Sequence, residues 1–367
     1  MSSAPPRILC YDARQFFVRC AYLAWPEELA GVELLAVGGH PERRGVVASA
    51  SYAARERGVR SGMPMATAVR LVPELVAVPV PRSVVHVKKE QVRAVIRRYA
   101  EAFETASVDE GYLQVAESDE PLEAVARRIR EAVGEETEIE CDFGGATLRY
   151  LSKMATRRAK RSGGVYVVPA GGEIDFLDSE ELGSIPGIGP AFLESLERRG
   201  VRTTAGARRI ELRTLVRWLK PARAHFLYNR VRAIDPSRIG EDREARKSIS
   251  AETTFERDLL DTGALDAALH DLAADVGQSL RRLGLEARTI GVKLREADFT
   301  DHGRSRTLPQ FITTDRVIYE TARELLHELR AAHRAPVRLL GVALSGLSGP
   351  GAAEQLTFRE IIPPIEE

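Results

Sequence analysis

Short apolar runs alternate with amphipathic stretches in the first part of the chain. The run at residues 7–12, bounded by Pro5-Pro6, predicts a buried strand. Apolar residues at helical spacing predict an amphipathic helix over 92–103. Altogether we expect strands at 7–12, 34–37 and 46–50, and helices at 66–71, 92–103, 121–133 and 147–160. This mixture of elements predicts an α+β domain.

Residues 107–112 read Ser-Val-Asp-Glu-Gly-Tyr. This segment includes the end of one short extended run, 106–108, and the start of another, 112–115. Turn residues between such runs indicate a hairpin whose arms meet at Asp109-Glu110-Gly111. In a regular strand the side chains of Asp109 and Glu110 would face opposite sides, but a turn lets both approach one site. Adjacent acids alone most often mark a solvated turn.

The pattern changes after Gly163-Gly164. Residues 176–235 are helical with short loops, and the stretch from Pro236 to Lys247 indicates an exposed linker. Residues 248–346 then give strand, helix (262–284), two strands, helix (314–333) and a last strand at 337–344. This order predicts a small sheet with both helices on one face.

Composition restricts the class of protein. A chain of 367 residues with 44% hydrophobic and 29% charged residues indicates a globular protein of two to four domains. It contains no apolar run of membrane-spanning length, so we expect no membrane partner. Three cysteines without metal-ligand spacing favour a reducing cytoplasm, so we expect a cytoplasmic protein.

Net charge is zero, with 53 basic and 53 acidic residues, so a nucleic-acid partner would need a local basic face. One basic patch comprises Arg157, Arg158, Lys160 and Arg161, and a second is spread over residues 198–217. Solvated helix faces would give the same charge pattern.

Three carboxylates carry the main chemical hypothesis. Asp12 ends the first apolar run, and Asp109 and Glu110 form the hairpin pair. Two strand ends bearing three carboxylates suit a pair of Mg²⁺ ions that drive phosphoryl or nucleotidyl transfer. We therefore take Asp12, Asp109 and Glu110 as the candidate catalytic and metal-binding residues.

Three further side chains suit phosphate binding. Arg55 has the bidentate geometry for phosphate oxygens, Tyr52 carries a hydroxyl donor, and Lys153 emerges among apolar neighbours as a point charge. Taken singly, each also fits an ordinary surface side chain.

Residues 182–190, Leu-Gly-Ser-Ile-Pro-Gly-Ile-Gly-Pro, indicate the hairpin of a helix-hairpin-helix motif. Gly187 and Gly189 would let backbone N–H groups approach a DNA phosphate, a contact that carries no sequence information. An ordinary helix–helix turn is the alternative.

These segments together resemble the Y-family translesion DNA polymerases, most closely the bacterial DNA polymerase IV branch. The resemblance covers residues 7–346 and rests on eight segments in family order. They are Tyr11-Asp12 with Phe16-Phe17, VVASASYAARERGV (46–59), SGMPM (61–65), SVDEGY (107–112), LSKMA (151–155), the 185–189 hairpin, KSISAETTF (247–255) and KLREADFTDHGRSRTLP (293–309).

The resemblance implies two Mg²⁺ ions held by Asp12, Asp109 and Glu110 with the carbonyl of Ala13. It implies triphosphate contacts from Tyr52, Arg55 and Lys153. Phe17 falls on the steric gate against ribonucleotides, and Phe16 is a packing residue whose backbone faces the phosphates. Primer-template DNA and dNTPs are the implied partners of a monomer.

The implied fold is a multidomain right hand. The predicted parts are an α/β palm (1–18 and 80–165), small fingers (19–79), a helical thumb (166–236), a linker (237–245) and a little finger of one sheet and two helices (246–346). Gly187 and Gly189 on the thumb, and Lys247, Ser248, Arg304 and Arg306 on the little finger, would contact DNA.

The chain departs from the family pattern at Arg157, which replaces a frequent acid, at Arg161, which replaces a frequent proline, and at two further places. Arg14 stands where the family usually has a second acid, and residues 144–149 (Gly-Gly-Ala-Thr-Leu-Arg) replace a Gly-x-x-x-Asn-Lys stretch. We expect activity to survive, since that second acid is not normally a metal ligand. An arginine at this position would shift the local field or meet a phosphate.

The C-terminal tail, 347–367, contains Gln355-Leu356-Thr357-Phe358 after a Gly/Ser/Pro stretch. Gln355, Leu356 and Phe358 resemble a degenerate sliding-clamp-binding peptide, which would supply processivity by tethering. An additional strand is the alternative.

The sequence thus favours a template-directed, Mg²⁺-dependent DNA polymerase. Two alternatives stay open at this point: a non-catalytic Y-family relative acting as a DNA- and clamp-binding scaffold, and a helix-hairpin-helix repair nuclease using the same acids.

Overall fold

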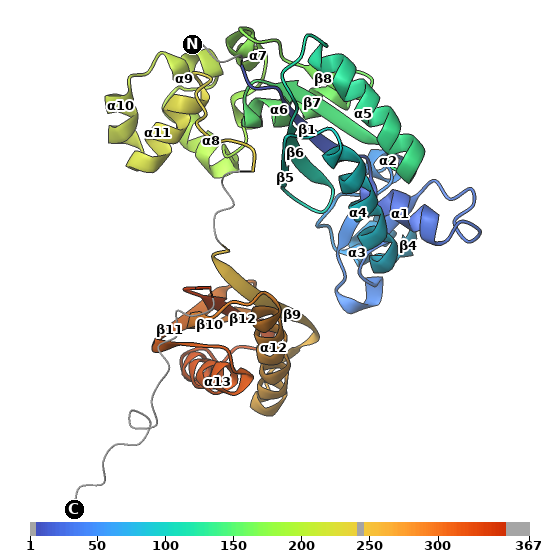
Figure 1. Cartoon of the computed structure of the whole chain (residues 1–367). Helices are drawn as coiled ribbons and strands as arrows, with labels where there is room; N and C mark the ends of the chain where they lie inside the picture. Colours follow the sequence, from blue (N-terminus) through green and yellow to red (C-terminus); the bar gives the residue numbers. More distant parts are fainter. Residues whose placement is uncertain (1–4, 241–245, 350–367) are drawn as a thin grey trace, which may run out of the picture. The chain divides into compact units, whose positions relative to one another are not determined.

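The computed structural model describes residues 5–240 and 246–349, and it divides into two compact units, Met1–Asp242 and Arg243–Glu367 (Figure 1). The division between the units falls inside the predicted linker. Within the described ranges, no helix is both long and apolar enough to cross a membrane.

A five-stranded sheet forms the centre of the first unit, in the order β5-β6-β1-β7-β8. β1 is antiparallel to both of its neighbours, and β7 runs parallel to β8. The strands are β1 (Ile8–Ala13), β5 (Ala102–Thr105), β6 (Glu110–Gln114), β7 (Cys141–Ala146) and β8 (Val165–Val167).

The alternation of side chains along β1 decides which helix each residue meets. Leu9 and Tyr11 share a core with the helices α4 (Arg82–Arg97) and α5 (Leu122–Thr137) on one face. Asp12 faces α6 (Arg149–Ala159), which packs against β1 and β7 on the other face. The period of two therefore directs Asp12 toward α6.

Gly144 of β7 determines how closely α6 can approach the sheet. A Cβ at this position would lie 2.1 Å from the backbone nitrogen of Thr156 and 2.2 Å from the carbonyl oxygen of Ser152. Only glycine fits there without moving the helix. The divergent stretch at 144–149 thus begins with a residue that fixes the helix against the sheet.

A smaller sheet, β3-β2-β4, lies beside the central one and carries three helices. Its elements are α1 (Phe16–Ala24), β2 (Leu35–Gly38), η1 (Pro41–Arg43), β3 (Val47–Ala50), α2 (Tyr52–Glu56), α3 (Met65–Leu71) and β4 (Val76–Val78). Ser51 begins α2, where its hydroxyl accepts the N–H of Ala54 at 3.3 Å and donates to the carbonyl of Glu33 at 2.6 Å. This cap fixes α2 and the side chains of its first turn.

Short helices complete the first unit: α7 (Glu173–Asp178), η2 (Leu182–Ser184), α8 (Pro190–Glu197), α9 (Thr204–Arg208), α10 (Leu212–Trp218) and α11 (Pro221–Arg230). They enclose an apolar core that includes Phe176, Leu196 and Leu227. Ile239, which follows them, is buried against Ile8. The predicted linker is therefore not exposed at this residue.

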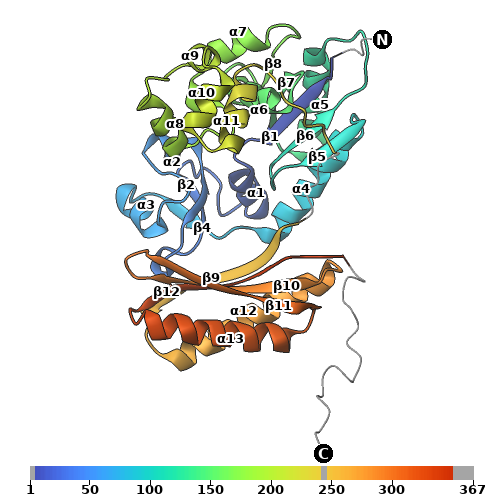
Figure 2. The ribbon, with the colours of Figure 1, turned by 90° about the vertical axis from the view of Figure 1, so that its left-hand side faces the viewer.

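The second unit is an antiparallel sheet, β11-β10-β12-β9, with both helices packed on one face (Figure 2). Its elements follow the predicted order: β9 (Ser248–Leu259), α12 (Thr262–Arg282), β10 (Ala287–Glu296), β11 (Asp301–Ile312), α13 (Asp315–Ala332) and β12 (Val337–Ser345). The other face of the sheet carries an open groove of about 430 Å³, lined by residues such as Ser250, Lys293 and Ser305.

Two predicted elements are shifted. The amphipathic helix ends at Arg97, before Phe103, which belongs to β5 and pairs with Leu113. Accordingly, the first hairpin arm is β5 and not residues 106–108, because Ser107 closes the turn with its own side chain. Strands β4, β7 and β8 were not predicted. β7 contains two glycines, which weaken the strand pattern.

Candidate active site

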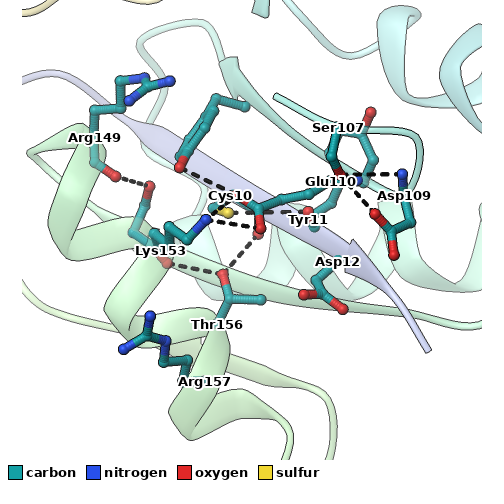
Figure 3. A network of polar contacts seen from close by, with 12 residues as sticks. Cys10, Tyr11, Asp12, Ser107, Asp109, Glu110, Arg149, Lys153, Thr156 and Arg157 are labelled. Carbon is teal, nitrogen blue, oxygen red and sulfur yellow. Dashed lines mark hydrogen bonds and ion pairs between the residues drawn. The ribbon is translucent and has the colours of Figure 1, made fainter. Parts of the chain in front are cut away.

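The three predicted acids gather where β1 and the β5–β6 hairpin end (Figure 3). Asp12 and Glu110 are directly opposite each other in the β1–β6 pairing, so their side chains leave the same face of the sheet. The carbonyl of Asp109, the residue just before β6, accepts the N–H of Ala13 at 2.9 Å. This backbone bond ties the hairpin to the end of β1.

Ser107 orients Asp109. Its hydroxyl donates to Oδ1 of Asp109 at 2.6 Å and accepts the N–H of Glu110 at 3.0 Å. The turn therefore presents both acids, as predicted from the pair, although Glu110 is already the first residue of a strand.

Two lysines from one face of α6 reach these acids. Lys153 donates from Nζ to both carboxylate oxygens of Glu110, at 2.6 and 2.9 Å, and the Nζ of Lys160, just past the helix, lies 2.9 Å from Oδ2 of Asp12. Seven residues make about two helical turns, so both lysine side chains point from the helix toward the sheet. Glu110 and Asp12 thus each have their own cation.

Burial raises the pKa of Asp12 above its ordinary value. The hydrogen bond and charge of Lys160 act in the opposite direction, while the charges of Asp109 and Glu110 add to the rise. A nearby cation therefore stabilises the charged form of the Asp12 carboxylate.

A pocket of about 310 Å³ joins the acids to the smaller sheet. It brings together most of the predicted metal- and nucleotide-binding side chains, namely Asp12, Asp109, Phe16, Phe17, Tyr52 and Arg55. Lys160 also lines it. An adjoining pocket of about 260 Å³ contains Glu110 and Lys153, and shares Asp12 and Lys160 with the first.

Lys160 is the site residue that sequence reasoning missed. The prediction placed Lys153 with Tyr52 and Arg55, but the lysine lining their pocket is Lys160. The sequence pattern contained this information, since Lys160 follows Lys153 at a spacing of seven within the predicted helix 147–160. It had been grouped with the basic patch of its neighbours.

Tyr52 and Arg55 occupy α2, whose start is capped by Ser51. Arg55 donates from Nε to the carbonyl of Ala50 at 2.8 Å, which holds the guanidinium along β3. The side chain of Tyr52 is about half exposed. Both side chains reach the pocket from the smaller sheet, opposite the acids.

Phe16 and Phe17 differ in burial, as expected. Phe16 is buried in the core of the central sheet, whereas Phe17 is partly buried against the smaller sheet and lines the pocket. Their rings pack edge to face with centroids 5.9 Å apart. Gln15, at φ 45°, makes the sharp turn between β1 and α1 that separates them from Asp12.

Arg14 lines the pocket that contains Asp12, Asp109 and Tyr52, but its guanidinium is held by an acid of β7 and not by the three predicted acids. Its guanidinium binds Asp142 on β7, which is fully buried, and its backbone N–H donates to the carbonyl of Glu140 at 2.8 Å. Asp142 is the partner of Asp12 in the β1–β7 pairing. The unusual arginine therefore pairs with a buried acid that lies opposite Asp12, which is two residues before Arg14.

The donor set fits divalent magnesium. All side-chain ligands offered by Asp12, Asp109 and Glu110 are carboxylate oxygens, which Mg²⁺ prefers. Two of these acids already hold an ammonium group, which shows that the geometry accommodates positive charge there. In the described chain their oxygens do not form a group within 4.8 Å of one another, so the acids are not closed around one point.

The predicted helix-hairpin-helix turn is present between η2 and α8. Gly187 has φ +99°, and a Cβ there would lie 2.4 Å from the ring of Phe226. Gly189 precedes α8 and has open space around it. Both glycines line a groove of about 470 Å³. The turn therefore leaves backbone accessible at Gly189.

The remaining predicted DNA contacts lie in the second unit. Lys247 and Ser248 are exposed at the start of β9. Arg304 donates to Glu328 of α13 at 3.0 Å, and Arg306 binds Glu324 and Glu328. A phosphate would have to compete with these glutamates. Gln355, Leu356 and Phe358 lie outside the described residues.

Family models and related proteins match this chain over most of its length. Residues 11–157 match the model of the impB/mucB/samB family, and residues 246–358 match its C-terminal domain. The DNA polymerase IV of Methanoculleus marisnigri is 37% identical over 370 residues, covering 98% of this chain and 99% of that protein. The chain belongs to the Y-family of DNA polymerases. A second Y-family relative, DNA polymerase IV of Dehalococcoides mccartyi, is 35% identical over 94% of this chain and 88% of its own length.

Solved structures share the Y-family fold. A Y-family polymerase chimera of Dbh and Dpo4 matches with a TM-score of 0.84 at 23% identity, over 94% of this chain and 99% of that one. The insertion ternary complex of Dbh DNA polymerase matches with a TM-score of 0.63 at 23% identity, over 92% and 98%.

The comparisons confirm the predicted family, the α+β multidomain fold and the polymerase class. The inactive-scaffold and nuclease alternatives have no comparable support. The assignments of individual site residues and of domain boundaries stay predictions.

Proposed function

We propose that this Y-family polymerase extends primer-template DNA past damaged bases, with its chemistry at Asp12, Asp109 and Glu110. The observation that carries the proposal is the shared pocket. Acids from the central sheet and phosphate-binding side chains from the smaller sheet, Tyr52 and Arg55, line one cavity with Lys160. Nucleotidyl transfer needs both sets within reach of one triphosphate.

Asp12, Asp109 and Glu110, with the carbonyl of Ala13, would hold two Mg²⁺ ions. When bound, such ions neutralise the charge on the transferring phosphate and align the attacking hydroxyl. The contribution of the chain is positional. The Ser107 turn orients Asp109, and the pairing of β1 with β6 fixes Asp12 beside Glu110.

Tyr52, Arg55 and Lys160 would bind the triphosphate from the smaller sheet and from α6. Lys153 remains a nucleotide-binding candidate, although its two contacts to Glu110 favour a role in orienting that carboxylate. Phe17 would exclude a ribose 2′-hydroxyl, since its ring lines the pocket between the acids and Tyr52. Phe16 would support it from the core.

DNA would be held by its backbone at two places. The Gly187/Gly189 turn offers N–H groups at the start of α8, and Lys247, Ser248, Arg304 and Arg306 offer cations and a hydroxyl in the second unit. Phosphate contacts of this kind position a duplex without reading its sequence. We further propose that the protein acts as a monomer, and that Gln355, Leu356 and Phe358 engage a sliding clamp.

Primer extension on undamaged and lesion-containing templates tests the proposal. The Asp109→Ala/Glu110→Ala variant should lose incorporation by at least about a thousandfold, because two of the three carboxylates that would hold Mg²⁺ are removed. The matched control is Glu135→Ala/Glu136→Ala, a second adjacent acidic pair, exposed on α5. Equal extension by wild type and the Asp109/Glu110 variant would refute the site. Cleavage of the DNA without added dNTP would indicate a nuclease instead.

A further inference from the structure

Glu296, His302 and His333 bring three metal-ligating side chains together in the second unit. In the described chain they are the group whose ligand atoms all lie within 4.8 Å of one another. Glu296 ends β10 and His302 is near the start of β11, the next strand of the same hairpin, whereas His333 follows α13. The polymerase site in the first unit uses none of them.

The two imidazoles are stacked rather than paired by hydrogen bonds. Their ring centroids are 3.6 Å apart with an angle of 20° between the planes. Nε2 of His302 is buried and has no hydrogen-bond partner, although Oε1 of Glu296 lies 3.5 Å away. A buried nitrogen left without a partner is costly, and a bound cation is one way to satisfy it.

We propose that Glu296, His302 and His333 bind one Zn²⁺ ion. Imidazole nitrogen and carboxylate oxygen are ligands that zinc takes readily, and a set of two histidines and one glutamate leaves the fourth position to water. Magnesium prefers oxygen ligands throughout, so the two imidazoles favour zinc over the cation of the polymerase site.

The distances agree with a tetrahedral ion after a small adjustment. Ligand atoms about 2.0–2.1 Å from a tetrahedral centre are about 3.3 Å from each other. The distance of 3.5 Å between Nε2 of His302 and Oε1 of Glu296 is already close to this value. Other ligand atoms of the group are up to 4.8 Å apart, so the rings would have to turn to bind one ion. Both histidines are partly exposed.

The backbone of the site is well fixed. Leu294 pairs with His302 across β10 and β11, which places Glu296 and His302 at the same end of the hairpin. The N–H of His333 donates to the carbonyl of Leu329 at 2.8 Å, and Arg330 donates to the carbonyl of His333 at 2.8 Å. Zinc at this point would therefore tie the β10–β11 hairpin to the end of α13.

Zinc content and affinity test the proposal on the untagged full chain. After equilibrium dialysis against ZnCl₂ in excess Mg²⁺, wild type and the Asp109→Ala/Glu110→Ala variant should each retain one zinc ion at this site. The second protein separates the cluster from the polymerase acids. Co²⁺ in place of zinc should give the visible absorption of a four-coordinate ion.

His302→Gln, His333→Gln and Glu296→Gln should each weaken zinc binding by at least about tenfold, a modest loss for a removed ligand. His270→Gln is the control, since His270 is an exposed histidine on α12 of the same unit. Circular dichroism of each variant verifies folding, and three independent variants keep the test decisive if one fails to fold. Absence of zinc from wild type would overturn the proposal. So would full affinity in any folded variant of the three, and the stacked rings would then be packing only.

Discussion

Arg14 donates from Nε and Nη2 to the same oxygen of Asp142, at 2.8 and 2.5 Å. Asp142 is fully buried, and its other oxygen has no hydrogen-bond partner. The arginine is thus the principal counter-charge of a buried carboxylate that neighbours Asp12 across the sheet. Arg14 and Asp142 therefore depend on each other, and Arg14 also lines the pocket of Tyr52 and Arg55.

Removal of Arg14 should therefore destabilise the first unit. Arg14→Ala leaves Asp142 buried without its cation, which should lower the free energy of unfolding by about 3 kcal/mol. The double variant Arg14→Ala/Asp142→Ala should recover much of that loss, since no buried charge remains. Urea denaturation of both proteins measures the difference. Arg19→Ala is the control, because Arg19 is exposed and donates only to a backbone carbonyl. Equal losses in the single and double variants would contradict the dependence.

The two lysines of the site should affect different kinetic constants. Lys160→Ala removes a cation from the pocket of Tyr52 and Arg55, so the KM for dNTP should rise by about ten- to a hundredfold, as for a lost charged hydrogen bond. Lys153→Ala frees Glu110, so it should mainly lower kcat. Steady-state single-nucleotide incorporation separates the two effects.

Lys89→Ala serves as the control for the lysine variants, because Lys89 pairs only with Glu90 on the surface of α4. If Lys153→Ala raises KM and Lys160→Ala leaves it unchanged, the assignment of the two lysines is reversed.

Phe17 should govern the choice of sugar. Phe17→Ala opens the pocket beside Tyr52, and incorporation of ribonucleotides relative to deoxyribonucleotides should rise by at least about tenfold, the lower end of what a change of pocket shape gives. Activity with dNTPs should persist, since Phe17 supplies no polar contact. Competition assays with matched dNTP and rNTP pairs measure the ratio. Phe299→Ala, an exposed phenylalanine of the second unit, is the control. Unchanged exclusion of ribonucleotides would place the gate elsewhere.

Alkaline pH should destabilise the first unit through Cys10. Burial raises the pKa of this thiol from 9.0 to about 12. A thiol whose pKa is higher in the folded state contributes stability that is intact below pH 9 and is lost as pH rises toward 12. The free energy of unfolding should fall over this window by up to about 1.4 kcal/mol per pH unit for this group.

Cys10→Ala removes that titration, so its stability should fall less steeply between pH 9.5 and 11.5 than that of wild type. Urea denaturation at a series of pH values compares the slopes. Ser83→Ala, an exposed substitution on α4, should keep the wild-type slope. Parallel slopes for Cys10→Ala and wild type would show that other groups, such as Tyr11, dominate the pH dependence.

The fold was predictable where periodicity is strong. The order of elements in the second unit follows from its long amphipathic helices, Thr262–Arg282 and Asp315–Ala332, and from strands of clear alternation. β7 escaped prediction because Gly144 and Gly145 occupy positions where strand residues are expected, and Gly144 is needed there to admit α6. A packing requirement thus overrode local propensity.

The site was predictable through residues that act near their own turn or strand. Asp109 and Glu110 are adjacent, and Phe16 and Phe17 follow Asp12 closely. The partners from other elements were not predictable. Asp142 is 128 positions from Arg14, and no local pattern links them. The same holds for Glu296, His302 and His333, which only the pairing of β10 with β11 and the end of α13 bring together.

Lys153 on α6 and Lys160 just after it also determine the net charge of the candidate active site. Three carboxylates with two ammonium groups against them give a formal charge of −1, where the acids alone would give −3. A site of −1 repels an incoming triphosphate much less than bare acids would. If Mg²⁺ ions were held by these carboxylates, Lys153 and Lys160 would no longer be needed as their counter-charges and could turn toward the phosphates. Metal binding and nucleotide binding should therefore favour each other, with α6, seated on Gly144, as the element that couples them.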